Sequence, residues 1–260
     1  GKIWGRGAAD MKSGIAAFIA AVSEFMETNK NLKDYGSISF IITSAEEGKA
    51  INGTKKVVEW LINKSEKISS CLVGEPTNVN KIGDTIKIGR RGSFTGSLIV
   101  KGIQGHVGYP DLAENPINSL LKMLEPFTKI YLDKGTSEFQ PSSVMITTID
   151  VNNDASNVIP GEVRATFNIR FNNKHSSKSL KKRLNIIFKK ISKKHKSKFK
   201  IEYRVSGEAF LTKPNKTTFM VQNVIKKITK IKPKLSTTGG TSDLRFIKAI
   251  CPGLEFGLVG

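Results

Sequence analysis

The sequence predicts an α/β fold in which a domain built on a mainly parallel sheet is interrupted by a smaller domain. Strand-like and helix-like segments alternate over residues 11–77, and this alternation is typical of a parallel sheet with helices on both faces. Beyond Gly92 the order of the segments changes, and after Gly207 another helix and strand follow. We therefore expect one domain at 1–92 and 207–260 and a second at 93–206.

The first domain places acidic residues at the ends of its strands. An amphipathic helix begins directly after Asp10, and the segments that follow are a strand, a helix and a strand at 37–43, 54–63 and 69–73. Glu46 and Glu47 come just after the first strand, and Glu75 comes just after the second. Ligands of parallel sheets bind beyond the carboxyl ends of the strands, so these acids are expected at the binding edge.

The interrupting domain at 93–206 has strands and helices in the order β-α-β-β-α-β, which is the order of a ferredoxin-like domain. The clearest strand signal is the alternation of apolar residues at 162–171. The expected strands are 94–101, 144–151, 162–171 and 199–205, and the expected helices are 116–125 and 177–194. The first domain then resumes with a helix at 219–231 and a strand at 254–259.

The formal net charge of +20 over 260 residues raises the question of a nucleic-acid partner. Lysines are densest at 178–200, where they fall between apolar residues that recur at helical spacing. No aromatic residues interleave with them for base stacking, so the pattern favours a solvated helix face. We expect no nucleic-acid partner, and a positive field that attracts an anionic small-molecule substrate.

Neither a membrane span nor a disulfide is expected. The sequence has no run of about eighteen apolar residues, the length that a membrane-spanning helix needs. Cys71 and Cys251 lie in apolar, strand-like runs, which is typical of buried, reduced thiols. We therefore expect a cytoplasmic protein with no membrane partner.

Asp10, Glu46, Glu47 and Glu75 are the candidates for chemistry. Carboxylates combined with histidines suit zinc or manganese. Beyond a strand end, a turn can direct one glutamate of the Glu46–Glu47 pair at a metal and the other at a bound water. Metal-assisted hydrolysis needs this combination of a ligand and a general base. From the residues alone, the alternatives are an N-cap role for Asp10 and a solvated turn for the pair.

Seven short strings, taken together and in order, resemble a known family. They are GRGAADMKSG at 5–14, SAEEG at 44–48, GEPT at 74–77, GRRGS at 89–93, GHVGYP at 105–110, NVIPGE at 157–162 and TGGTSD at 238–243, with EFG at 255–257 adding to them. They resemble the co-catalytic zinc amidohydrolases and exopeptidases, which include acetylornithine deacetylase. The resemblance spans the chain. It implies a zinc-exopeptidase-like catalytic domain interrupted by a dimerisation, or lid, domain.

The resemblance implies a role for each of the four acids. Asp10 looks like the carboxylate that bridges two zinc ions, and the peptide bond after it is expected to be cis. Glu46 looks like the general base. Glu47 and Glu75 look like ligands of one zinc ion each, with cobalt possible in one site.

The resemblance also implies residues that bind substrate. His106 looks like a catalytic residue that reaches across a homodimer, formed through the 93–206 domain, to help stabilise the tetrahedral oxyanion. Tyr109 would accompany it. The resemblance makes Arg90, Asn157 and Arg170 binders of substrate carboxylates, and Gly240 and Thr241 would complete the pocket. Guanidinium forks suit a substrate with several carboxylates. Arg170 has the alternative of a solvent-facing strand residue.

The strings at 89–93 and 157–162 fit best the branch of the family that hydrolyses N-succinyl-L,L-2,6-diaminopimelate. The products would be succinate and L,L-diaminopimelate, for lysine and cell-wall synthesis in a bacterium. Deacylation of acetylornithine or of another acyl-amino acid is the close alternative, and a metal-free dimeric binding module is the alternative from a different class. The resemblance places two further zinc-binding histidines outside residues 1–260. Residues 1–260 by themselves are therefore expected to be inactive.

Overall fold

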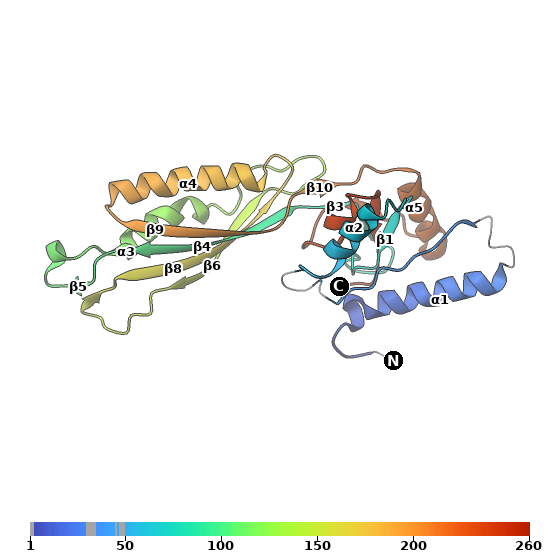
Figure 1. Ribbon diagram of the computed structural model, residues 1–260, viewed down its shortest axis with the longest axis horizontal. Coiled ribbons are helices and arrows are strands. Elements are labelled where there is room, and N and C mark those ends of the chain that lie inside the picture. The colour runs from blue at the N-terminus through green and yellow to red at the C-terminus, as the bar shows by residue number, and fades with distance from the viewer. Residues whose placement is uncertain (1–2, 30–34, 45, 47–49) are drawn as a thin grey trace. The chain divides into compact units, whose positions relative to one another are not determined.

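The chain folds into two compact units, which are described separately. In the computed structural model, residues 3–29, 35–44, 46 and 50–260 are described. Unit 1 comprises Gly1–Arg90 and Leu211–Gly260, and unit 2 comprises Arg91–Phe210. The sequence-based boundaries at 92/93 and 206/207 lie within a few residues of these. Figure 1 shows that each unit has its own sheet and its own helices.

Unit 1 contains a four-stranded sheet in the order β1-β12-β2-β11. β1 runs parallel to β12 and β2 runs parallel to β11, whereas β12 and β2 are antiparallel. Buried Ile86, Ile88, Ile225 and Leu254 form a hydrophobic cluster in this unit. The strands are β1 (Cys71–Val73), β2 (Thr85–Lys87), β11 (Lys234–Ser236) and β12 (Gly253–Glu255).

The helices of unit 1 include two that the sequence predicts closely. The helix expected at 54–63 is confirmed with the same bounds, and the one expected at 219–231 is observed slightly earlier in the chain. The helix expected after Asp10 follows a distorted turn, Ala8–Lys12 (η1). The helices are α1 (Ser13–Thr28), α2 (Thr54–Asn63), α5 (Lys216–Thr229) and α6 (Leu244–Ile247).

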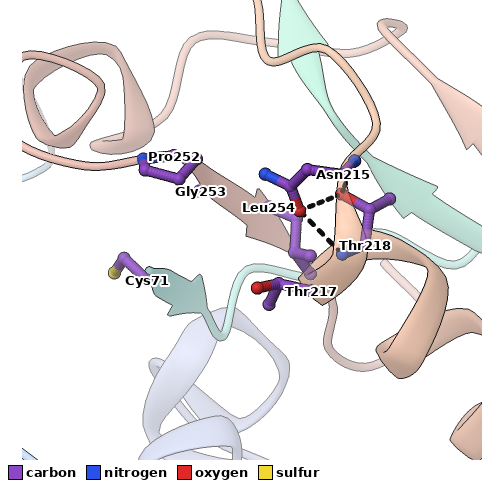
Figure 2. A pocket seen from close by; sticks show the side chains of 7 residues that line it. All are labelled: Cys71, Asn215, Thr217, Thr218, Pro252, Gly253 and Leu254. Atoms are coloured by element: carbon purple, nitrogen blue, oxygen red, sulfur yellow. Dashed lines mark hydrogen bonds between the residues drawn. The ribbon is translucent and has the colours of Figure 1, made fainter. Parts of the chain in front are cut away.

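The start of α5 shows how local sequence sets a helix boundary. Asn215 is the N-cap, and its side chain accepts a hydrogen bond of 3.1 Å from the backbone N–H of Thr218. Figure 2 shows this cap beside a shallow hollow, at the amino ends of β1 and β12, near Cys71 and Gly253. Glu75 lies beyond the opposite, carboxyl end of β1, and Glu255 is the last residue of β12, so the hollow is separate from the candidate site.

The strand expected at 37–43 is not observed, and this prediction was wrong. These residues are described, yet none is assigned to a strand. Ile38, Phe40 and Ile42 keep the apolar alternation that suggested a strand, but all three are exposed. Alternation indicates only that a segment suits a sheet, whereas a strand also needs a neighbour to pair with its backbone N–H and C=O groups.

Unit 2 has the β-α-β-β-α-β order that the sequence predicts. Its four strands are all antiparallel and lie in the order β6-β8-β4-β9. The strands are β4 (Gly92–Lys101), β6 (Ser143–Asp150), β8 (Glu162–Phe171) and β9 (Lys198–Gly207). The helices are α3 (Pro116–Leu124), α4 (Ser177–Lys194) and the short η3 (Pro110–Leu112) and η4 (Glu125–Thr128).

The core of unit 2 lies between one face of this sheet and the two longer helices. Phe94, Leu98, Phe167 and Phe171 point from the strands into a cluster of buried side chains contributed also by α3 and α4. Figure 1 shows α4 running along the sheet. Residues between these positions, such as Arg170 on β8, therefore lie on the opposite face, because successive side chains of a strand alternate.

Helix α4 has the solvated basic face that its sequence predicts. Leu180, Leu184 and Phe188 are buried on one side. Its exposed lysines are Lys178, Lys182, Lys189, Lys190, Lys193 and Lys194. Among the described residues, no helix is long and apolar enough to cross a membrane.

Four short strands complete the fold. β5 (Gly105–His106) pairs with β7 (Val158–Ile159) in a ribbon, with His106 opposite Val158. The other pair is β3 (Gly89–Arg90) and β10 (Phe210–Leu211), where the chain passes from one unit to the other. The sequence signals did not predict β2, β5, β7 or β11, because strands of two or three residues carry too little periodicity.

A buried polar network around Asp133 fixes the loop before β6 to the segment after β8. Asp133 Oδ1 accepts hydrogen bonds from Gly135 N–H at 2.6 Å and from Asn172 Nδ2 at 2.8 Å, and Oδ2 lies 3.1 Å from His175 Nε2. Burial alone would raise the pKa of Asp133. Hydrogen bonds from Ser142, Gly135 and Asn172 outweigh it and hold the pKa well below its usual value.

We predict that Asp133→Asn lowers the free energy of unfolding at pH 7 by about 1.5–3 kcal/mol, the usual contribution of hydrogen bonds to a charged group. Because the folded-state pKa is depressed, this contribution is complete above the unfolded pKa of about 4 and is lost as the pH falls below it. Urea unfolding followed by circular dichroism at pH 7 and pH 3 should show the difference from wild type shrinking in acid. The exposed Asp150→Asn is the control, and an equal effect of the two substitutions would contradict the prediction.

Candidate active site

Three of the acids predicted from the sequence gather in unit 1. Glu75 follows β1, and burial raises its pKa to about 7, with the negative charges of Asp10, Glu46 and Glu255 adding to the increase and Arg90 opposing it. Asp10, Glu46 and Glu75 come from three separate parts of the sequence. The negative charges of Asp10 and Glu46 thus lie near enough to Glu75 to raise its pKa.

Close backbone packing fixes the positions of Asp10, just before α1, and of Glu75. A Cβ atom on Gly14, at the start of α1, would lie 2.8 Å from the carbonyl oxygen of Gly74. A Cβ atom on Gly257 would lie 2.4 Å from the carbonyl oxygen of Glu75. Only glycine therefore fits at these two positions. The cis peptide bond expected after Asp10 is also present, between Asp10 and Met11.

Glu46, the expected general base, lies beside Arg245. The Arg245 Nη1 atom is 3.5 Å from Glu46 Oε1, and its Nη2 atom is 3.8 Å from Asp243 Oδ1. Asp243 also accepts a hydrogen bond from the hydroxyl of Thr54. Sequence reasoning did not select Arg245, although it lies two residues beyond the TGGTSD string.

Arg90, expected to bind a substrate carboxylate, already donates hydrogen bonds to other groups of unit 1. Its side chain is 7% exposed, and Nε and Nη2 both donate to Glu255 Oε2, the former at 2.9 Å. Nη1 donates to the carbonyl oxygen of Thr238 at 2.9 Å. A substrate carboxylate would have to displace these partners, so the contacts favour a positioning role for Arg90.

The loop that carries Gly240 and Thr241 lies against Arg90. A Cβ atom on Gly239, whose φ is +103°, would lie 2.2 Å from Arg90 Nη1. The hydroxyl of Ser242 donates to Glu255 Oε1. Gly240 is exposed and Thr241 is half-buried. The ion pair beneath the loop thus orders a segment whose surface residues remain available to a ligand.

The expected lid residues His106, Tyr109 and Asn157 lie together in unit 2. The His106 and Tyr109 ring centroids are 6.0 Å apart, and the backbone N–H of Val107 donates to the carbonyl oxygen of Asn157 at 3.0 Å. His106 Nδ1 accepts a hydrogen bond of 3.0 Å from the N–H of Gly108, which leaves Nε2 to face a ligand. All three side chains are exposed.

Arg170 lies on the open face of the unit 2 sheet, opposite Ser93 of β4 and Ser143 of β6. Its Nε atom donates to Asn168 Oδ1 at 3.0 Å. Burial lowers the pKa of Arg170, and the positive charge of Arg91 lowers it further. The sequence offered Arg170 as a substrate ligand or a solvent-facing residue; the structure makes it partly buried, beside a second guanidinium.

The acids of unit 1 fit a metal ion in part. Carboxylate oxygens are suitable donors, and the repulsion that raises the pKa of Glu75 would be relieved by a cation. Glu47, expected as a ligand, lies outside the described residues. Within the described part of the chain, no group of three or more His, Cys, Asp or Glu residues is arranged to hold a metal ion.

A mixed α/β unit in which Glu75 follows a strand and lies near Asp10 and Glu46, interrupted by a ferredoxin-like unit, defines the class of protein. The model of peptidase family M20/M25/M40 matches residues 1–260, and the chain belongs to this family. It is 66% identical, over 98% of its length, to a succinyl-diaminopimelate desuccinylase of Pelagibacter ubique (strain HTCC1062). It is 49% identical, over 99% of its length, to a protein of the same name from Parvibaculum lavamentivorans.

The chain spans 66% and 64% of the lengths of these two relatives. Among solved structures, aminopeptidase PepT from Bacillus cereus ATCC 10987 is similar over 96% of this chain and 62% of its own, with a TM-score of 0.71 and 20% identity. A tripeptidase from Staphylococcus aureus is similar over 79% of this chain and 53% of its own, with a TM-score of 0.63 and 16% identity. At these identities the structural comparisons establish the fold.

We predict that Arg90→Met lowers the free energy of unfolding of unit 1 by about 3–5 kcal/mol, because it leaves the fully buried Glu255 carboxylate without its partner. Urea unfolding followed by the fluorescence of Trp60 would measure this. The control is Lys56→Met in the same unit, which removes an exposed lysine paired with Glu59 at 3.1 Å and should cost about 0–1 kcal/mol. Equal losses in the two variants would show that the Arg90–Glu255 pair is not a major stabilising contact.

Proposed function

We propose that the protein to which this chain belongs hydrolyses N-succinyl-L,L-2,6-diaminopimelate to succinate and L,L-diaminopimelate in the bacterial cytoplasm. The observation that carries the proposal is the gathering of Asp10, Glu46 and Glu75 in a chain 66% identical to a protein named succinyl-diaminopimelate desuccinylase. Acids held this closely suit a divalent metal site and a general base, which are the two requirements of amide hydrolysis at neutral pH.

Two divalent metal ions, zinc with cobalt possible in one site, would be held by Asp10 between them and by Glu47 and Glu75. The resemblance places two histidine ligands outside residues 1–260, so these residues alone are proposed to be inactive. Bound metal would supply Lewis acidity and lower the pKa of water at the site. Glu46 would accept a proton from the attacking water and transfer it to the leaving amine.

Arg245 supports the proposed role of Glu46. Its guanidinium lies within 4 Å of both the Glu46 and the Asp243 carboxylates, so it can orient Glu46 while Asp243 offsets its charge. Arg90 supports the site differently, because its pair with Glu255 orders the loop of Gly240 and Thr241. In this proposal the exposed surface of that loop contacts substrate.

Distances inside unit 2 support the proposed homodimer. Arg170 and Glu162 lie eight residues apart on β8, which is about 26 Å along a strand. His106 lies beyond the Glu162 end, because Gly102 and Gly161 are hydrogen-bonded there and the β5–β7 ribbon follows. One chain therefore cannot bring His106 and Arg170 to the same small substrate. Two chains can, if His106 serves the site of the partner subunit.

The substrate assignment predicts a preference that kinetics can measure. Protein extended to the full length of the relatives should hydrolyse N-succinyl-diaminopimelate with a kcat/KM at least about 100-fold above that for acetylornithine, since buried polar sites discriminate strongly against ligands that leave them unpaired. The 260-residue chain should show no turnover. Glu46→Gln should lower kcat about 10²–10⁴-fold, the usual contribution of general base catalysis. Equal kcat/KM values for the two substrates would contradict the assignment.

The dimer proposal predicts complementation between two inactive full-length variants. Glu46→Gln and His106→Ala should each lose activity, and mixing them after reversible dissociation should restore about one quarter of the wild-type rate, because half of the random dimers carry one complete site of two. Mixing either variant with itself is the control. If His106 acted within its own chain, no activity would return.

A further inference from the structure

We propose that Arg91, together with Arg170, forms a carboxylate-binding site on the open face of the unit 2 sheet. Arg91 has no role in the proposed function, in which the arginines with a role are Arg90, Arg170 and Arg245. The inference rests on that function for its biological meaning, since the substrate there carries several carboxylates. It identifies Arg91 as a residue that determines specificity.

The strand order forces the two guanidinium groups together. Arg91 directly precedes β4, and its Nη1 atom reaches the carbonyl oxygen of Pro141 at 2.9 Å and the hydroxyl of Ser143, on β6, at 3.5 Å. β8 lies between β4 and β6. The Arg91 side chain therefore crosses over β8 at the row Ser93–Arg170–Ser143, where Arg170 occupies the middle position.

Neither guanidinium has an anionic partner within unit 2. Among the described residues, no carboxylate forms an ion pair with Arg91 or Arg170. The Arg91 Nε atom is buried and has no hydrogen-bond partner in this part of the chain. Two like charges side by side with an unsatisfied donor are unfavourable, and a bound anion would relieve both costs.

The chemistry of the surroundings favours a carboxylate over other anions. Arginine forks match the planar, two-oxygen geometry of a carboxylate, and Arg170 keeps its two terminal nitrogens for this purpose while Nε is held by Asn168. Ser93 and Ser143 add neutral hydroxyl groups on either side. We infer that the ligand is the terminal carboxylate of a small dicarboxylate or of an acyl-amino acid.

The test measures binding of succinate to the 260-residue chain by calorimetry at low salt. Arg91→Gln should weaken binding about 10- to 100-fold, the loss expected for one charge-assisted contact. The matched control is Arg164→Gln, which removes a positive charge from the same face of β8 and should change affinity less than about twofold because that arginine is exposed and screened. Circular dichroism would check the folding of each variant.

Several outcomes would overturn the inference. These are absence of succinate binding to the wild-type chain, equal losses in Arg91→Gln and Arg164→Gln, and tighter binding of inorganic phosphate than of succinate. If Arg91→Gln does not fold, Arg91→Lys decides, because it keeps the charge but removes the fork: weaker binding supports the inference and unchanged binding rejects it. In protein extended to the full length of the relatives, succinate binding without turnover would reject only the proposed function, and turnover without a role for Arg91 would reject only this inference.

Discussion

The buried ion pair between Arg90 and Glu255 is the contact on which the candidate site of unit 1 depends. Glu255 is completely buried, and its two carboxylate oxygens are divided between Arg90 and the hydroxyl of Ser242. One side chain thus fixes the end of β12, the strand β3 and the loop before α6. The same pair acts on Glu75 in opposite directions, since Glu255 raises its pKa and Arg90 lowers it. A buried pair of this kind adds little to net stability but leaves a large penalty if broken, so it fixes geometry.

Charges of one sign are concentrated at each of the two sites, and each concentration suits a ligand of the opposite charge. In unit 1, the negative charges of Asp10, Glu46 and Glu255 raise the pKa of Glu75, and a divalent cation would offset this repulsion. In unit 2, the guanidinium groups of Arg91 and Arg170 lie side by side and suit an anion. Each arrangement costs folding free energy without its ligand, and such local costs are typical of sites that bind.

The parts of the fold that were predictable are those with long, regular patterns. Helix α4 and strand β8 have the bounds that periodicity indicates, because eighteen and ten residues repeat a signal many times. The segment 37–43 has an equally clear alternation but no strand, since pairing depends on residues distant in sequence. The two-residue strand that carries His106 could not be predicted, because it is too short to show periodicity. Val158, which pairs with His106, lies fifty-two residues away in the sequence.

The sequence by itself identified Asp10, Glu46 and Glu75 as the acids of the candidate site from their local motifs, although only Glu75 follows an observed strand. Only the tertiary structure decided the different fates of the adjacent Arg90 and Arg91. The Arg90 side chain lies in unit 1, where it forms an ion pair with Glu255. Arg91 directly precedes β4, and its side chain extends over β8 to the hydroxyl of Ser143. In sequence the two are equivalent guanidinium groups. Their partners, 165 and 52 residues further along the chain, determine which is neutralised and which remains to bind an anion.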